Sequence, residues 1–161
     1  MQPAFTREIL RGARVLGLHT ALDTSGFLGR HADEALLAET DLVLLDLKSG
    51  LPDVYREVTE RPLQPTLDFA RRLDAMNKPV WIRFVLVPGL TDSVDNVRAA
   101  AGIVASLGNV EKVEILPFHK MGEPKWQALG LKYRLAATPE ASAEQVDEAR
   151  RVFESEGCPV G

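Results

Sequence analysis

The sequence predicts an α/β fold in which four parallel strands alternate with helices. The first observation is that segments with apolar residues at helical spacing alternate with short, almost continuous apolar runs. The second is the segment DLVLLDLK at residues 41–48, whose four consecutive apolar residues are typical of a strand buried on both faces of a parallel sheet. Strand–helix alternation implies parallel strands joined by right-handed crossovers.

The expected strands end at residues that commonly interrupt extended structure. They cover residues 16–22, 42–47, 80–87 and 113–116. The first is followed by Asp23 and a Thr-Ser-Gly turn, the third by Pro88 and Gly89, and the fourth by Pro117. We expect Trp81, in the third strand, to lie in the core.

The expected helices carry recognisable start and stop signals. They cover residues 4–15, 33–39, 65–76, 93–107 and 142–156, with a helical turn at 126–129. Pro65 is near the start of the third helix. Asp92 or Ser93 can cap the fourth helix, Gly108 ends it, and Ser142 is the expected cap of the last.

Length and composition restrict the class of protein. A chain of 161 residues can form one domain with a core, so we expect residues 1–161 to be a single domain. The net charge of −4 argues against a nucleic-acid partner. No apolar run reaches the roughly 18–20 residues that span a bilayer, and the N-terminus lacks the apolar core of a signal peptide. We therefore expect a cytoplasmic location, with no membrane partner.

The cysteine content and the strand count set further limits. Cys158 is the single cysteine, so we expect no internal disulfide and no iron–sulfur ligand set in this chain. Four strands are too few to close a (β/α) barrel, which usually has about eight. An open sheet and a truncated barrel both explain the pattern. The chain starts with a helix that no strand precedes, and this favours the truncated barrel.

Polar residues follow the apolar part of each strand. Residues i and i+2 of a strand point to the same side, so Asp46 and Lys48 share a face. The carboxyl ends of parallel strands meet at one edge of the fold, where α/β enzymes bind their ligands. The residues expected to converge there are Asp23, Thr24, Ser25, Asp46, Lys48, Arg83 and His119.

These residues also have purely structural interpretations. Asp46 could pair with Lys48 as a solvated strand end. Arg83, the only charge among its eight strand residues, could form a structural ion pair with Asp46 or Asp23. Thr24 could cap the following turn. The argument for function rests on convergence, because four strands ending in this way is less expected by chance than any single case.

Four segments in order carry a family resemblance. They read HTALDTSGF, DLVLLDLK, WIRFVLVPGLTD and GNVEKVEILPFHKMGEPKW. These resemble the pyruvate formate-lyase activating enzymes, radical S-adenosylmethionine (SAM) proteins that install a glycyl radical. The resemblance extends over residues 2–153. It implies a partial (β/α) barrel of the radical SAM type, of which this chain would carry the last four parallel strands with their helices.

The resemblance also implies missing parts. In the family, a CxxxCxxC motif that ligates a 4Fe–4S cluster and a GGE segment that holds SAM lie upstream of the matching region. This chain has one cysteine, in another place. We therefore expect a C-terminal portion of such an enzyme that is inactive alone.

Several cofactor contacts are implied for individual residues. Asp23 and Thr24 would lie beside the SAM site, and Asp46 would share a monovalent-cation site with them. His119 would approach the adenosine part of SAM. These residue types suit their ligands, because ribose hydroxyls bind carboxylates and imidazoles.

Two basic residues are the candidate catalytic residues. Lys48 would contact SAM or the incoming glycine-loop peptide, and Arg83 would sit between SAM and that peptide. Both would also belong to the cofactor site, since the methionine carboxylate of SAM requires a cationic donor. Glu60 stands where relatives often have glycine, so the local loop and partner docking depart from the family pattern.

The implied chemistry needs the complete enzyme. In the intact family the cluster donates an electron to SAM, and the resulting radical abstracts hydrogen from a glycine of a partner, the glycyl radical enzyme. Two other hypotheses remain open from the residues: a non-catalytic remnant that binds SAM or peptide, and an unrelated small α/β enzyme that acts on an anionic substrate. We also expect self-association through the exposed edge of the strand at residues 16–22.

Overall fold

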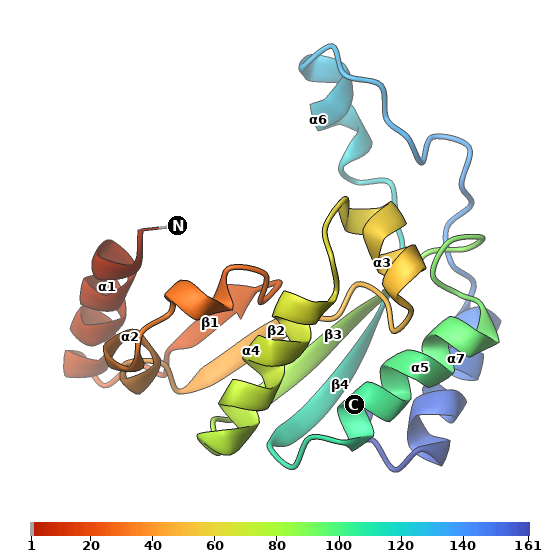
Figure 1. The fold of residues 1–161 in the computed structure, drawn as a ribbon. Coiled ribbons are helices and arrows are strands. Elements are labelled where there is room, and N and C mark those ends of the chain that lie inside the picture. Colours follow the sequence, from red (N-terminus) through yellow and green to blue (C-terminus); the bar gives the residue numbers. More distant parts are fainter. Residues whose placement is uncertain (1) are drawn as a thin grey trace.

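The computed structural model describes residues 2–161. Within that range four strands form one sheet in the order β1-β2-β3-β4, and every neighbouring pair is parallel (Figure 1). The strands are β1 (Ala21–Thr24), β2 (Leu42–Asp46), β3 (Val80–Leu86) and β4 (Val110–Pro117). The predicted α/β fold with four parallel strands is confirmed, and the sheet is open rather than closed into a barrel.

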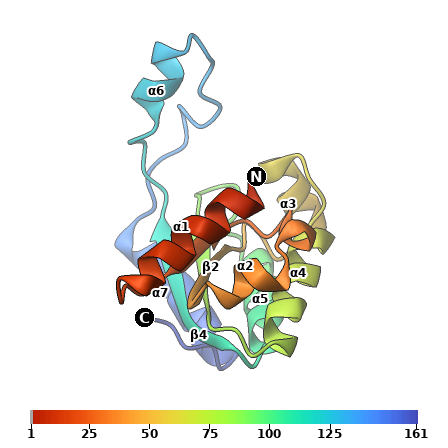
Figure 2. The same ribbon diagram turned by 90° about the vertical axis from the view of Figure 1, so that its left-hand side faces the viewer.

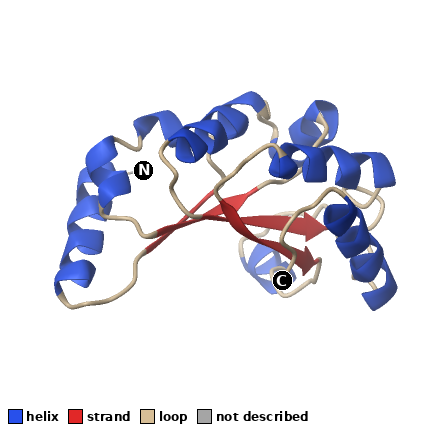
Figure 3. Ribbon diagram, turned by 90° about the horizontal axis from the view of Figure 1, so that it is seen from below, coloured by secondary structure: helices blue, strands red, loops and turns tan. Residues whose placement is uncertain are grey.

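The helices form an arc around one side of this sheet (Figure 3), except α6, which projects away from the sheet (Figure 1). They are α1 (Pro3–Val15), the 3-10 helix η1 (Gly29–His31), α2 (Glu34–Ala38), α3 (Pro52–Thr59), α4 (Gln64–Ala75), α5 (Val94–Ala105), α6 (Glu123–Ala128) and α7 (Ala143–Ser155). In the described part of the chain, no helix is long and apolar enough to cross a membrane.

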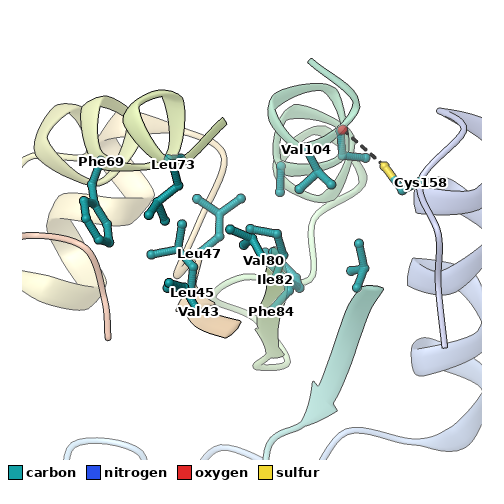
Figure 4. Close-up of a cluster of buried hydrophobic side chains, with 14 of the residues drawn as sticks. Val43, Leu45, Leu47, Phe69, Leu73, Val80, Ile82, Phe84, Val104 and Cys158 are labelled. Atoms are coloured by element: carbon teal, nitrogen blue, oxygen red, sulfur yellow. Dashed lines mark hydrogen bonds between the residues drawn. The ribbon is translucent and has the colours of Figure 1, made fainter. Parts of the chain in front are cut away.

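The core lies between the sheet and these helices. Side chains alternate along β3, so that Ile82 and Phe84 are fully buried while their neighbours are half-buried. Leu73 from α4 and Val104 from α5 point toward the buried face of the sheet (Figure 4). Burying each such side chain contributes about 1.5–3 kcal/mol. The opposite face, which carries Arg83, is called the open face below.

Trp81 is a correction to the sequence prediction. It lies on the open face, half-buried, and not in the core. Its indole N–H donates to Glu111 over 3.4 Å, and the Lys112 ammonium lies 4.7 Å from the ring centroid. The apolar character of β3 suggested a core residue, but the period of two places position 81 on the same face as Arg83.

A buried polar cluster fixes the loop after β2. The side-chain oxygen of Asn96, in the first turn of α5, accepts hydrogen bonds from the Ser49 hydroxyl (2.6 Å) and the Gly50 amide (2.9 Å). A Cβ at Gly50 would lie 2.1 Å from the Ala100 backbone nitrogen, so only glycine fits. The chain immediately after Lys48 is therefore held against α5.

Several elements differ from the predicted ones, among them the following three. The first strand begins at Ala21 instead of residue 16, because Gly17 takes a left-handed turn (φ 75°) after α1. Helix α3 was not predicted, although Pro52 occupies a favoured first-turn position. β4 begins at Val110, three residues earlier than predicted.

The two edges of the sheet differ. Along β4, the Val113 N–H donates to the Pro159 carbonyl (2.7 Å) and the Gly161 N–H donates to the Val113 carbonyl (3.2 Å). Val113 and Val160 thus form a parallel bridge that extends the sheet. Along β1, residues 2–161 provide only one partner strand, β2. The edge expected at the first strand is therefore present.

Candidate functional site

An ion-pair network connects three strands on the open face. Asp46 is its centre: one carboxylate oxygen accepts from Nε of Arg83 (2.9 Å) and the other from Nζ of Lys48 (2.8 Å). A terminal nitrogen of the Arg83 guanidinium also pairs with the Asp23 carboxylate. Two acids and two bases thus meet at one place. Asp23 comes from β1, Asp46 from β2 and Arg83 from β3, and Lys48 follows β2.

The sheet register explains why these residues meet. Asp46 is the direct partner of Arg83 across the β2–β3 ladder. Asp23 is the partner of Leu44, which lies two residues before Asp46 on the same face. Sequence reasoning expected Asp46 and Lys48 to share a face, and their 2.8 Å contact confirms it.

The network is half-buried and charged. The side chains of Asp46, Arg83 and Lys48 are 18%, 20% and 29% exposed, whereas Asp23 is 59% exposed. Burial alone would lower the pKa of the Arg83 guanidinium, but the carboxylates of Asp46 and Asp23 more than offset this, and its pKa is raised. Arg83 is therefore a permanent cation.

This arrangement can bind an anionic group at the open face. A guanidinium has five N–H donors in a planar fork, and Arg83 uses two of its nitrogens on Asp46 and Asp23. Charge-assisted hydrogen bonds from Arg and Lys to a carboxylate are the strong class of hydrogen bond. The exposed Asp23 can exchange its partner at little desolvation cost, because water reaches it.

Three other predicted residues do not join the network. The Thr24 hydroxyl accepts from the Gly26 amide (3.1 Å) and so caps the turn after β1. The Ser25 carbonyl accepts from the Thr66 hydroxyl (2.8 Å). His119 is exposed beyond β4, and its Nδ1 accepts from the Met121 amide (3.3 Å).

A second ion pair on the open face was missed by sequence reasoning. Nζ of Lys112 lies 2.9 Å from the Glu114 carboxylate, and Glu114 is the register partner of Arg83 on β4. The signal was available, since the two charges are at i and i+2 of an extended segment, as Asp46 and Lys48 are. It was lost because the predicted strand began after Lys112.

The donor set of this chain does not fit an iron–sulfur cluster. Cys158 is the single cysteine, and it is buried far along the chain from the network, near α7. Burial, followed by the nearby Glu156 carboxylate, raises the pKa of its thiol. Among residues 2–161, no group of three or more His, Cys, Asp or Glu side chains is placed to hold a metal ion.

Comparison with known proteins gives relatives of one kind. The chain is 36% identical over 162 residues to the pyruvate formate-lyase 1-activating enzyme of Escherichia coli, covering 99% of this chain and 66% of that protein. The chain thus spans about two thirds of the length of that relative. No protein-family model matches.

Two solved structures share the fold. A domain of the pyruvate-formate lyase-activating enzyme from Bacteroides vulgatus superposes with a TM-score of 0.82 at 23% identity, over 99% of this chain and 90% of that one. A radical SAM methyltransferase from Sphaerobacter thermophilus gives 0.67 at 18% identity, over 91% and 41%. At these identities the likeness concerns the fold.

Proposed function

The chain belongs to the family of the pyruvate formate-lyase activating enzymes, and from that premise we propose that it forms the wall of a radical SAM active site that orients SAM and a glycine-bearing peptide. The observation that carries this proposal is the Asp23–Arg83–Asp46–Lys48 network on the open face. The likeness over 99% of the chain does not favour an unrelated enzyme or a binding remnant.

Within this site the two bases have the central roles. We assign Lys48 and Arg83 to the methionine carboxylate of SAM and to the backbone of the incoming peptide, because both are cations with donors directed to the open face. Asp46 holds the two in place through its two oxygens. Its position between them keeps their spacing fixed while a ligand binds.

The remaining residues are assigned to the polar parts of the ligand. Asp23 is exposed enough to turn from Arg83 to a ribose hydroxyl. Asp23, Asp46 and the Thr24 main chain are proposed to supply oxygen ligands to a monovalent cation, which prefers such donors. His119 is proposed to reach the adenosine part, which requires the segment after β4 to move inward.

The redox chemistry lies outside the residues of this chain. When bound in a complete enzyme, a 4Fe–4S cluster and SAM supply the radical chemistry. The cluster needs cysteine ligands, and the one cysteine here is buried. The residues of this chain bind, orient and exclude water from the reacting groups.

The proposed partner is a glycyl radical enzyme of the pyruvate formate-lyase kind, in the cytoplasm. We also propose self-association through the β1 edge, where four residues pair only with β2 among residues 2–161. Light scattering at about 100 µM should detect dimers. Ala21→Lys, which places a charge on this edge, should restore a monomer, and a monodisperse wild-type monomer would contradict the proposal.

A chimera tests the proposed function. The matching region of the Escherichia coli relative is replaced by this chain, and the glycyl radical formed on pyruvate formate-lyase is measured anaerobically by electron paramagnetic resonance. We expect Lys48→Ala and Arg83→Ala to reduce radical formation by about 100-fold or more. Arg98→Ala, which removes a charge that is 59% exposed on α5, is the matched control. Unchanged radical formation in Lys48→Ala would refute the proposal.

A further inference from the structure

A projecting segment beyond β4 contributes no residue to the ion-pair network. Residues 119–138, called the arm below, extend away from the sheet and carry α6 (Figure 2). No residue of α6 is buried. The arm is nevertheless folded: Trp126 packs against Tyr133 with ring centroids 5.9 Å apart, and the Leu131 amide donates to the Trp126 carbonyl (2.9 Å).

The surface of the arm differs from the rest of the chain. Its exposed apolar side chains are Met121 (79%), Leu129 (72%), Leu131 (53%) and Trp126 (40%). Its charges are four Lys or Arg and one Glu, while the whole chain has 19 Lys and Arg against 23 Asp and Glu. An apolar surface bordered mainly by basic charges is typical of a protein-interaction site.

A groove of about 560 Å³ lies between the arm, α3 and the loop after β3. Its apolar lining includes Val58, Val87, Pro88, Leu90, Trp126 and Leu135. The loop follows the strand that carries Arg83, and α3 begins four residues after Lys48. Two walls of the groove are therefore continuous in sequence with the segments that carry Lys48 and Arg83.

The two walls of the groove have opposite charge. Glu57 and Glu60 are on the α3 side, and Arg134 is on the arm. Glu60 reaches across to Arg134 (3.6 Å), and both side chains are more than half exposed. Such an exposed pair is weak, so a ligand can separate the arm from α3. A bound segment would be oriented with its acidic end toward the arm.

We propose that the arm and this groove dock a surface loop of the partner protein whose apolar side chains are flanked by acidic residues. This rests on the proposed function, in which the substrate is a glycine within a folded protein. The apolar side chains fill the groove, and the acidic ones pair with Lys125 and Lys132. Docking beside the network holds the glycine loop near Lys48 and Arg83.

Binding measurements test this inference. The chain is immobilised, and non-radical pyruvate formate-lyase from Escherichia coli is the probe. We expect saturable binding that weakens as salt rises from about 50 to about 300 mM. The double variant Lys125→Glu/Lys132→Glu should raise Kd by about tenfold or more. Arg71→Glu/Arg98→Glu, which makes the same charge change at exposed positions of α4 and α5, should leave Kd within about twofold.

The outcomes separate this inference from the proposed function. No saturable binding up to about 100 µM, or equal weakening by both double variants, overturns the docking proposal. In the chimera, the arm variant should lower radical formation on the intact partner but not on a short glycine peptide. Equal rates for wild type and the arm variant on both substrates also overturn it, while Lys48→Ala still tests the proposed function by itself.

Discussion

The two edges of the sheet are stabilised to different degrees. At the β4 edge the segment from Pro159 to Gly161 adds a parallel bridge, and Phe153 of α7 is fully buried. At the β1 edge α1 buries none of its residues, and Phe5 is 62% exposed. The same chain thus contains one edge covered by its own residues and one whose neighbouring helix has an unburied apolar side.

This difference indicates how the sheet distributes its stability. The Phe153 ring packs edge-on against Phe84 of β3, with centroids 5.7 Å apart, so α7 is part of the main core. Helix α1 packs the partly buried Leu10 against the core, and its Arg14 donates to the Ala38 carbonyl (2.8 Å) and pairs with Asp41 (3.1 Å). Exposed polar contacts of this kind contribute little. We therefore expect the β1 side to open first.

The largest expected effect is on the free energy of unfolding, and it differs between Phe153 and Phe5. Phe153→Ala should lower the free energy of unfolding by about 3–5 kcal/mol, because it leaves a cavity against Phe84. Phe5→Ala should change it by less than about 0.5 kcal/mol, because that ring is exposed. Urea unfolding followed by circular dichroism measures both. A large loss for Phe5→Ala would mean that the Phe5 ring is buried within the monomer in solution.

The second prediction concerns the β4 edge when the residues that cover it are removed. Ending the chain at Cys158 removes the two hydrogen bonds to Val113, and should cost about 1–3 kcal/mol. Hydrogen exchange at the Val113 amide should become faster, while exchange at the Leu44 amide in the centre of the sheet should not. If both amides respond equally, the terminal segment stabilises the whole fold and not the β4 edge.

The smallest expected effect is a pH response at the start of β1. The Thr20 amide (2.8 Å) and hydroxyl (2.9 Å) donate to the Asp41 carboxylate, and these bonds lower the pKa of Asp41 from its ordinary value of 3.8. A lowered pKa in the folded state means that the stabilisation is complete above pH 3.8 and is lost as pH falls through the lower, folded value.

The Thr20 amide proton reports this titration by NMR. Its chemical shift should follow a midpoint below 3.8. Asp41→Asn should remove the step, since an amide does not titrate in this range. A midpoint at or above 3.8 would show that the hydrogen bonds to Thr20 do not persist in solution.

Much of the fold could be predicted because β2 and β3 are rich in apolar residues and alternate with segments of helical spacing. The errors occur where apolar residues are not buried. Leu16 and Leu18 look like strand residues, but they are exposed around a turn at Gly17, so the first strand was placed too early. Helix α3 is short, and its C-terminal cap Glu60 has a left-handed backbone conformation. A glycine at this position would have indicated the end of a helix in the sequence, but a glutamate does not.

The candidate site was predicted as far as strand geometry reaches. The period of two predicted that Asp46 and Lys48 share a face, and the common edge of parallel strand ends predicted that Asp23 and Arg83 lie near them. The observed register brings these four residues together. His119 lies beyond the end of β4, where backbone periodicity no longer determines direction, and it points to its own loop. The Lys112–Glu114 pair required the correct start of β4.

The sequential order of the strands has a consequence for synthesis of the chain. Within residues 2–161 each strand pairs with the strands before and after it in the sequence and with no other strand, so this part of the sheet can assemble in the order in which a ribosome releases it. The Lys48 loop is completed only when Asn96 emerges, and β4 gains its edge partner only with residues 159–161. During translation, the edge that is best protected in the finished molecule is therefore the last to be covered.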